Sequence, residues 1–365
     1  MFARGDIGGW TDSYFVIKIN LYSSLIRPIL FRFDPEQVHN GAISLGEILG
    51  HFSLTRMLVS SIYNYRGRDI SRTVDGNTYR TPFILAAGFD YNARLTQILP
   101  AIGLGGVEVG SVTARPCTGN PRPRLRRLPR SRSILVSKGL RNDGVETIIP
   151  RLKKRSQEKN FVIGISIART NDANSAEVEA GIEDYCFSLK QCMTHNVGDY
   201  YTLNISCPNV FGGETFTTPS LLKKLLEAIK KVSCPKPVYV KMPINLAWEQ
   251  FNELLQVIAD YNLAGVIIGN LNKDYSSLDY QAEMPAQYVG GLSGKPCRDL
   301  STSLIRRTRE CYGEKFTIIG CGGVMSPSEA QGKFAAGADL IQLITGLIYE
   351  GPGLVKKLCC SLNHS

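Results

Sequence analysis

The chain has 365 residues, of which 43% are hydrophobic and 20% are charged, and its formal net charge at pH 7 is +10. This balance supplies a large core and excludes a chain that is disordered throughout, while the basic excess favours anionic partners such as phosphates, acidic lipids or nucleic acid. The ten cysteines include no Cys-x-x-Cys pair and there are four histidines, so a disulfide framework and a zinc site are both disfavoured.

Residues 15–65 are predicted to form two or three short helices. Asp34-Pro35 has the composition of a helix start, an N-cap followed by proline at the first helical position. Apolar residues follow at helical spacing, namely Val38, Ala42, Leu45 and Leu49. Two interpretations are open: amphipathic helices that lie on a membrane surface, or a helical pair packed on the main domain. The first fourteen residues show no signal-peptide pattern, and no apolar run is long enough for a membrane span.

From about residue 80 short apolar runs alternate with helix-like stretches. The runs predict strands at 83–88, 106–112, 161–167, 200–206, 237–242, 265–270, 316–323 and 340–346. Helices are expected between most of them, at 176–192, 219–232, 247–261, 302–312 and 327–336. The strand candidates are continuously apolar rather than alternating, which indicates burial on both faces.

Eight such β/α units predict an α/β fold, a (β/α)8 TIM barrel with a small N-terminal helical extension. The other arrangement considered is an open doubly wound sheet. The first βα turn lacks the Gly-x-Gly-x-x-Gly pattern of that fold, and this favours the barrel.

In such a barrel the chemistry lies at the carboxyl ends of the strands. After the seventh predicted strand, GCGGVMSPSEA gives a glycine turn that leads into a helix, and ITG follows the eighth strand. Backbone N–H groups exposed at such turns bind phosphate. A phosphate site is therefore predicted at Gly322, Gly323, Thr345 and Gly346, the alternative being that the glycines only make tight turns.

Polar side chains at other strand ends predict the rest of a site. Lys241 ends the fifth strand, and a lysine inside a barrel mouth should face an anion or an acceptor unless it forms a structural salt bridge. Asn204, Asn209 and Asn270 offer amide groups to a planar polar ring. Cys207 lies between the first two asparagines. Its thiol, with an ordinary pKa of about 8.5, is either a base or an inert buried sulfur.

Several motifs in chain order resemble the dihydroorotate dehydrogenases: AAGFD, VEVGSVT, GNPRPRLRRLP, NISCPN, GGLSGKPCRDLS, IIGCGGV and AGADLIQL. The segment RPILFRFDPEQVH is similar to the start of the membrane-associated, quinone-dependent class, class 2. The resemblance covers residues 21–358. It implies an N-terminal amphipathic helical segment for membrane contact and quinone access at residues 1–65, and an FMN-binding TIM-barrel catalytic domain at residues 66–365.

The resemblance implies a flavoprotein that oxidises dihydroorotate to orotate and passes the electrons to a membrane quinone. FMN would contact Ala87, Gly88, Ser111, Ser166, Asn204, Lys241, Gly269, Gly294, Gly322, Gly323, Thr345 and Gly346. The substrate would contact Asn204, Asn209, Asn270, Lys138 and Tyr91. Cys207 falls on the position of the catalytic base, which takes a proton from C5 of dihydroorotate while a hydride leaves C6. Lys241 would lie beside the flavin ring and favour its anionic reduced form.

Some positions depart from the family pattern around the flavin and the base. The membrane class usually has serine where this chain has Cys207, and a cysteine there is similar to the soluble classes. Ser166 replaces a flavin-side asparagine, and Gly269 replaces a threonine. The residue after Asn270 is Leu271.

Other departures alter the substrate pocket. Tyr91 replaces a lysine that helps hold orotate, and Val136 replaces an asparagine that contacts it. Lys138 or Arg141 is expected to restore a cation for the carboxylate of the substrate. The alternative is an FMN-dependent oxidoreductase of the same fold that acts on a different dihydropyrimidine or on an activated alkene.

Seven arginines lie between residues 115 and 132. They are expected to flank the site and to pair with acidic groups, the alternative being attachment to anionic lipid or RNA. The segment contains no aromatic residue for base stacking, which argues against nucleic acid. A further interpretation is a degenerate barrel, not an enzyme, whose basic face binds lipid or RNA. The expected location is peripheral, on the cytoplasmic face of a bacterial inner membrane, or at the mitochondrial inner membrane in a eukaryote.

Overall fold

Eight parallel strands close into a barrel in the order β10-β12-β13-β3-β4-β7-β8-β9. The computed structural model describes residues 21–154, 158–211, 213, 215–287 and 289–362. The barrel strands are β3 (Phe83–Leu85), β4 (Gly106–Val112), β7 (Val162–Ile167), β8 (Tyr200–Asn204), β9 (Val238–Met242), β10 (Gly265–Ile268), β12 (Thr317–Cys321) and β13 (Leu340–Leu343). Each lies within the range predicted for it, so the predicted (β/α)8 barrel is confirmed.

The barrel wall has an apolar outer side and a layered interior, because alternate strand residues point to opposite sides. Val107 and Val240 belong to the large cluster between strands and helices, whereas Tyr200 and Tyr239 belong to a second cluster inside the barrel. One step further along the strands the interior residues are polar and buried: Glu108, Thr202, Lys241 and Gln342. Buried polar side chains therefore lie directly beneath the barrel mouth.

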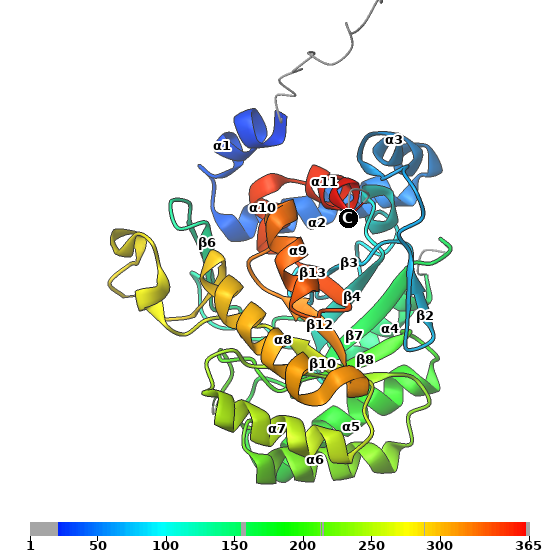
Figure 1. Ribbon diagram of the computed structural model, residues 1–365, viewed down its shortest axis with the longest axis vertical. Helices are drawn as coiled ribbons and strands as arrows, with labels where there is room; N and C mark the ends of the chain where they lie inside the picture. Colours follow the sequence, from blue (N-terminus) through cyan, green and yellow to red (C-terminus); the bar gives the residue numbers. More distant parts are fainter. Residues whose placement is uncertain (1–20, 155–157, 212, 214, 288, 363–365) are drawn as a thin grey trace, which may run out of the picture.

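Helices cover the outside of the barrel (Figure 1). They are α4 (Val145–Lys153), α5 (Val178–Thr194), α6 (Pro219–Val232), α7 (Trp248–Asp260), α8 (Arg298–Tyr312), α9 (Pro327–Ala335), α10 (Thr345–Glu350) and α11 (Gly353–Ser361). The five predicted helices are confirmed as α5 to α9, although α8 begins four residues before its predicted start at residue 302. Short 3-10 helices complete the connections: η2 (Leu99–Ile102), η3 (Tyr275–Ser277), η4 (Gln281–Glu283), η5 (Lys295–Cys297) and η6 (Gly313–Lys315).

The N-terminal segment is helical, as predicted, in the part that the structure describes; residues 15–20 lie outside it. Its elements are η1 (Tyr22–Ile26), α1 (Arg27–Leu30), α2 (Pro35–His51) and α3 (Ser53–Tyr63). The carboxylate of Asp34 accepts a hydrogen bond from the backbone N–H of Gln37 at 2.9 Å, which confirms the predicted N-cap. The buried side of α2 carries Glu36, His39 and Ile43, while Leu45 of the apolar series is 57% exposed.

Two small sheets were not predicted. A hairpin of β1 (Arg72–Val74) and β2 (Asn77–Tyr79) places Tyr79 in the cluster inside the barrel. An antiparallel sheet pairs β6 (Ser133–Val136) with β5 (Leu125–Leu128) on one edge and with β11 (Gly291–Gly294) on the other. This second sheet supplies residues to the cavity at the barrel mouth.

Candidate active site

A cavity of about 410 Å3 opens at the carboxyl ends of the barrel strands and extends beneath α2. The structure brings together at its wall the following residues from the sequence analysis: Ala87, Gly88, Tyr91, Ser111, Lys138, Asn204, Cys207, Asn209, Lys241, Gly269, Asn270, Gly294, Gly322, Gly323, Thr345 and Gly346. Ser166 does not line the cavity and lies behind Ser111. One space is thus bordered by a glycine turn, amide side chains, a thiol and a lysine.

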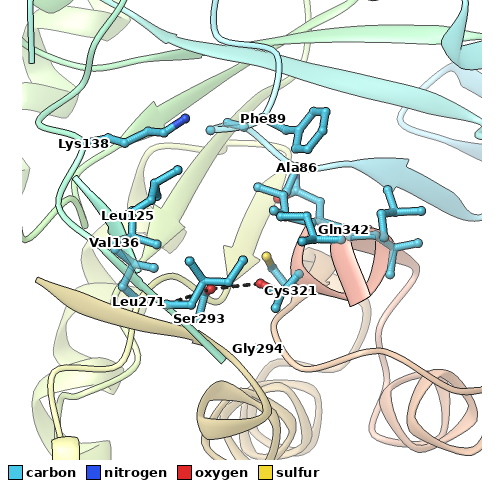
Figure 2. Close-up of a pocket in the computed structure, with 18 of the residues that line it drawn as sticks. Ala86, Phe89, Leu125, Val136, Lys138, Leu271, Ser293, Gly294, Cys321 and Gln342 are labelled. Carbon is cyan, nitrogen blue, oxygen red and sulfur yellow. Dashed lines mark hydrogen bonds between the residues drawn. The ribbon is translucent and has the colours of Figure 1, made fainter. Parts of the chain in front are cut away.

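One end of the cavity is bordered by glycines and hydroxyl groups. Gly322 and Gly323 have φ angles of +112° and +76°, a conformation that glycine adopts without steric cost. Next to them, Thr345 Oγ1 donates to Ser293 Oγ at 2.9 Å. In Figure 2, Ser293 and Gly294 lie at the opposite end of the view from Lys138. Because glycine has no side chain, a ligand at this end can contact the backbone directly.

A chain of polar contacts crosses the barrel mouth from β7 to the end of β10. Ser166 Oγ is 2.8 Å from Ser111 Oγ, which accepts a hydrogen bond from Asn204 Nδ2 at 2.8 Å. Ser206 Oγ lies 3.2 Å from Asn204 Oδ1 and accepts from Asn270 Nδ2 at 2.7 Å. Ser166 is thus connected to the cavity wall through Ser111, and the amides of Asn204 and Asn270 are held in fixed orientations.

The loop after β8 carries the candidate base. Cys207 follows Ser206 and is partly buried at the cavity wall. Two residues on, Asn209 Nδ2 donates to the backbone carbonyl of Val136 at 2.9 Å. The backbone carbonyl of Asn209 accepts from Asn120 Nδ2 at 3.1 Å. These contacts attach the loop to the end of β6.

Lys241 forms part of a buried polar cluster. Its Nζ lies 3.8 Å from Glu108 Oε1 and donates to Gln342 Oε1 at 3.4 Å. Glu108 Oε2 accepts from Gln342 Nε2 at 2.9 Å and from Thr202 Oγ1 at 2.9 Å. Both interpretations given for Lys241 thus describe part of its surroundings, because it makes an ion pair and also borders the cavity.

Glu108 and Gln342 were not among the residues expected at the site. Each is the one charged or amide side chain in its stretch of sequence, VEVGSV and LIQLITG. A charged or amide side chain in a strand buried on both faces can only point into the barrel interior when the neighbouring residues face the helices. That signal was available in the sequence.

The other end of the cavity lies beneath α2 and carries polar atoms that lack partners. Within the described residues, Lys138 Nζ and His39 Nε2 are buried without a hydrogen bond. Lys138 Nζ lies 4.7 Å from the centroid of the Tyr91 ring, on which the His39 ring is stacked at a centroid distance of 5.6 Å.

Burial controls the ionisation of both groups beneath α2. It lowers the pKa of Lys138 to about 7, although the nearby Glu36 carboxylate acts in the opposite direction. Burial also lowers the pKa of His39 well below its ordinary value, and the positive charges of Lys138 and Arg141 lower it further. His39 is therefore a neutral imidazole near neutral pH.

Glu36 joins α2 to the arginine-rich segment. It accepts from Arg124 Nη1 at 2.9 Å and from Arg141 Nη1 at 3.0 Å, and it also forms an ion pair with Arg122 at 3.3 Å. Of the two cations expected to serve the substrate, Arg141 is therefore already paired. Lys138 is the one whose terminal nitrogen has no hydrogen bond within the described residues.

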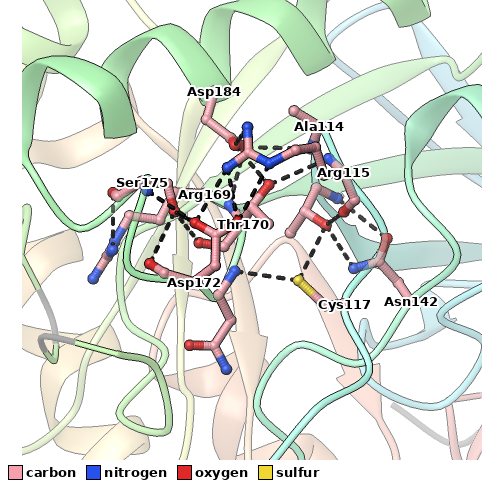
Figure 3. A network of polar contacts seen from close by, with 11 residues as sticks. Ala114, Arg115, Cys117, Asn142, Arg169, Thr170, Asp172, Ser175 and Asp184 are labelled. Carbon is pink, nitrogen blue, oxygen red and sulfur yellow. Dashed lines mark hydrogen bonds and ion pairs between the residues drawn. The ribbon is translucent and has the colours of Figure 1, made fainter.

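The start of the arginine-rich segment is also paired internally (Figure 3). Arg115 forms ion pairs with Asp172 at 2.9 Å and with Asp184 at 3.5 Å. Asp184 Oδ1 accepts the backbone N–H of Thr170 at 3.0 Å. Further along, Arg132 pairs with Glu350. These contacts agree with the expectation that arginines of this segment pair with acidic groups beside the site.

The chain is similar to known proteins over most of its length. Residues 70–365 match the family model described as dihydroorotate dehydrogenase. Two relatives, both named dihydroorotate dehydrogenase (quinone), come from Christiangramia forsetii and Thermosynechococcus vestitus. The first is 34% identical, covering 93% of this chain and 97% of the relative, and the second is 36% identical, covering 94% and 96%.

Solved structures agree with the sequence relatives. The crystal structure of the dihydroorotate dehydrogenase of Eimeria tenella in complex with ferulenol superimposes with a TM-score of 0.76 at 25% identity, covering 90% of both chains. The ligand-free form of that enzyme gives a TM-score of 0.72 and covers 87% of this chain and 93% of that one. The chain described here belongs to the dihydroorotate dehydrogenase family.

Proposed function

We propose that the chain oxidises dihydroorotate to orotate, with FMN as cofactor and a quinone as electron acceptor. The relatives reported above carry this reaction in their names, and enzymes of this family depend on a flavin. One observation carries the proposal at the level of the site. A glycine turn, fixed asparagine amides, a thiol and a buried lysine border the same cavity.

The donor set fits FMN, which has a phosphate at one end and a planar polar ring at the other. Backbone around Gly294, Gly322, Gly323 and Gly346, with the hydroxyl of Thr345, would hold the phosphate. We assign contacts with the flavin ring to the backbone or side chains of Ala87, Gly88, Ser111, Asn204, Lys241 and Gly269. Ser166 would hold Ser111 in place through the contact between their hydroxyl groups. When bound, FMN would supply the acceptor for the hydride that leaves the substrate.

Cys207 would remove the proton from C5 of dihydroorotate. The ordinary pKa of a thiol is closer to neutrality than that of a hydroxyl, which suits a general base. Asn204 and Asn270 would orient the substrate ring, since Ser206 contacts both amides before any ligand arrives. Asn209 would contribute from the loop that carries the base. Such prior ordering reduces the entropy lost when the substrate is positioned.

Lys138 would bind the carboxylate of the substrate, beside the Tyr91 ring. A buried ammonium without an acceptor is costly, so a ligand with an anionic group should occupy this end of the cavity. The phosphate of FMN is assigned to the glycine end, away from Lys138 in Figure 2, and a quinone is uncharged. The carboxylate of dihydroorotate is the anion that remains.

The N-terminal helices, within residues 1–65, would contact a membrane and admit the quinone to the barrel domain of residues 66–365. Their exposed large apolar side chains are Leu21, Leu25, Ile26, Ile29, Phe33, Leu45, Ile48, Phe52, Leu54, Met57, Leu58 and Ile62. The same helices also line the cavity, through Pro35, Val38 and His39 of α2 among others. No helix in the described part of the chain has the length and apolarity needed to cross a bilayer.

Helices with one apolar side toward lipid and another toward a cavity suit peripheral attachment. The membrane would be the bacterial inner membrane at its cytoplasmic face, or the mitochondrial inner membrane in a eukaryote. Because arginines of the segment 115–132 are paired within the protein, nucleic acid is not proposed as a partner.

Anaerobic titration of the purified protein with dihydroorotate tests the reaction. We expect a yellow protein whose flavin absorbance is bleached by dihydroorotate and restored by a quinone analogue. A protein that binds FMN but is not bleached would contradict the substrate, and a protein that refuses FMN would contradict the cofactor. Because the relatives reported above name one reaction, other dihydropyrimidines and activated alkenes enter only as comparison compounds in the same titration.

A further inference from the structure

A carboxylate is enclosed in the barrel interior beside Lys241 of β9. The side chain of Glu108, on β4, is fully buried, whereas Lys241 borders the cavity. Lys241 Nζ lies 3.8 Å from Glu108 Oε1, and this oxygen has no hydrogen bond within the described residues. The ammonium of the ion pair therefore borders the cavity, whereas the carboxylate is buried inside the barrel.

The other oxygen of the carboxylate is firmly held. Glu108 Oε2 accepts from Thr202 Oγ1 and from Gln342 Nε2, both at 2.9 Å, and from the Tyr200 hydroxyl at 3.3 Å. Gln342 also accepts from Lys241 Nζ, so one amide contacts both members of the pair. The position of the carboxylate relative to the ammonium is thus set by residues of two other strands, β8 and β13.

A buried ion pair is weak support for stability, because apolar residues of similar volume often stabilise a protein as well or better. The strand residues one step deeper in the barrel are apolar or aromatic and fill its interior. We therefore expect the charged pair of Glu108 and Lys241, which lies next to the cavity, to act on the ligand rather than on stability. The role depends on charge, since a neutral residue could make hydrogen bonds to Thr202 and Gln342 equally well.

We propose that Glu108 sets the reduction potential of the bound flavin by compensating the positive charge of Lys241. This inference rests on the proposed function, in which the flavin ring lies beside Lys241. A reduced, anionic ring is stabilised by a nearby ammonium. A carboxylate 3.8 Å from that ammonium opposes the stabilisation, and it does so strongly where water is excluded. Glu108 is fully buried and is not among the residues that line the cavity, so it would act on the flavin through Lys241, as a positioning residue.

Four holoproteins separate the charge of the pair from its shape: the wild type, Glu108→Gln, Lys241→Gln and the double variant. The midpoint potential of the bound flavin is measured in each by anaerobic reductive titration against a reference dye. We expect the potential to follow the net charge of the pair. Glu108→Gln should have the highest value, Lys241→Gln the lowest, and the wild type and the double variant intermediate values. For a two-electron couple, a tenfold change in the equilibrium constant corresponds to about 30 mV.

Thr202→Val is the matched control, because it removes one hydrogen bond to Glu108 and leaves both charges in place. Its potential should remain much closer to the wild-type value than that of Glu108→Gln. If Glu108→Gln does not retain flavin, the comparison of Lys241→Gln with the double variant decides, since these also differ only in the charge at position 108.

Equal potentials in Lys241→Gln and the double variant, or an unchanged potential in Glu108→Gln, would overturn the inference and leave the proposed function intact. A wild-type protein that does not bind FMN would overturn the proposed function, and the inference with it. The two failures are therefore distinguishable in one set of measurements.

Discussion

At the end of the cavity beside β8, Ser206 contacts the amides of both Asn204 and Asn270. At the end beneath α2, Lys138 Nζ and His39 Nε2 are buried without a hydrogen bond in the described residues. The barrel mouth, here called the ordered end, has its polar contacts in place before a ligand arrives. The end beneath α2 is completed only by a ligand. Residues at the ordered end would position the reacting groups, whereas residues beneath α2 would recognise the charge of the substrate.

Replacing the candidate base should give the largest effect, at the ordered end. Cys207→Ala is expected to lower kcat by about 100- to 10,000-fold, because a general base contributes that much. Flavin content and the affinity for orotate should change little, since the amide contacts with Ser206 remain. Steady-state kinetics and flavin absorbance check both points.

Cys311→Ala is the matched control for this variant, because Cys311 is an exposed thiol on α8. It should keep the wild-type rate. A Cys207→Ala enzyme as fast as the control would show that the base is another group.

Removing the cation should affect substrate affinity rather than turnover. Lys138→Met is expected to weaken orotate binding by about 10- to 100-fold, the value of a charge-assisted hydrogen bond. Binding of uracil, the same ring without the carboxylate, should be nearly unchanged. Both affinities can be measured from ligand-induced changes in the flavin spectrum.

Lys224→Met provides a control with the same loss of charge on the outer helix α6, where the side chain is 55% exposed. It should leave both affinities unchanged. An equal loss of orotate and uracil binding in Lys138→Met would indicate a structural role, and a raised KM for the quinone alone would place the ammonium at the acceptor.

The ionisation of Lys138 predicts how the affinity for orotate changes with pH. Its pKa in the folded protein is lowered to about 7, so the ammonium is present below that pH and is lost above it. Orotate affinity should therefore fall as pH rises above about 7, and binding should take up a proton there. His39 stays neutral in this range because its pKa is lowered, and Arg141 and Glu36 form an ion pair with each other.

Titrating orotate between about pH 6 and 9 checks this expectation. Lys138→Met should show a much flatter profile over the same range. Measuring the binding of the product, rather than turnover, keeps the proton transfer step out of the result. A wild-type affinity that is constant across the range would contradict the assignment.

The ordered end was largely predictable from the sequence, and the end beneath α2 was not. Asn204, Lys241 and Gly322 each follow or end a continuously apolar run, and the barrel topology brings such strand ends to one mouth. By contrast, β5 has the sequence LRRL and is only partly buried. It is formed by pairing with β6 rather than by any pattern of its own.

The choice between Lys138 and Arg141 also needed the structure. Both are basic residues in one loop, and composition cannot distinguish them. Arg141 is paired with Glu36 of α2, more than one hundred residues earlier in the chain. Only this tertiary contact shows which cation is left for a ligand.

The smallest effect is expected at Tyr91, which supports the ammonium through its ring. Tyr91→Leu removes the cation–π contact at 4.7 Å and should weaken orotate binding by about 2- to 5-fold. Tyr91→Phe keeps the ring and loses only the hydroxyl, whose contact with Asn40 Oδ1 is long at 3.4 Å, so binding should change less than about twofold. If the two variants weakened binding equally, the hydroxyl rather than the ring would be the group that matters. The end beneath α2 would then contain a second polar contact to the substrate, and its contrast with the ordered end would be reduced.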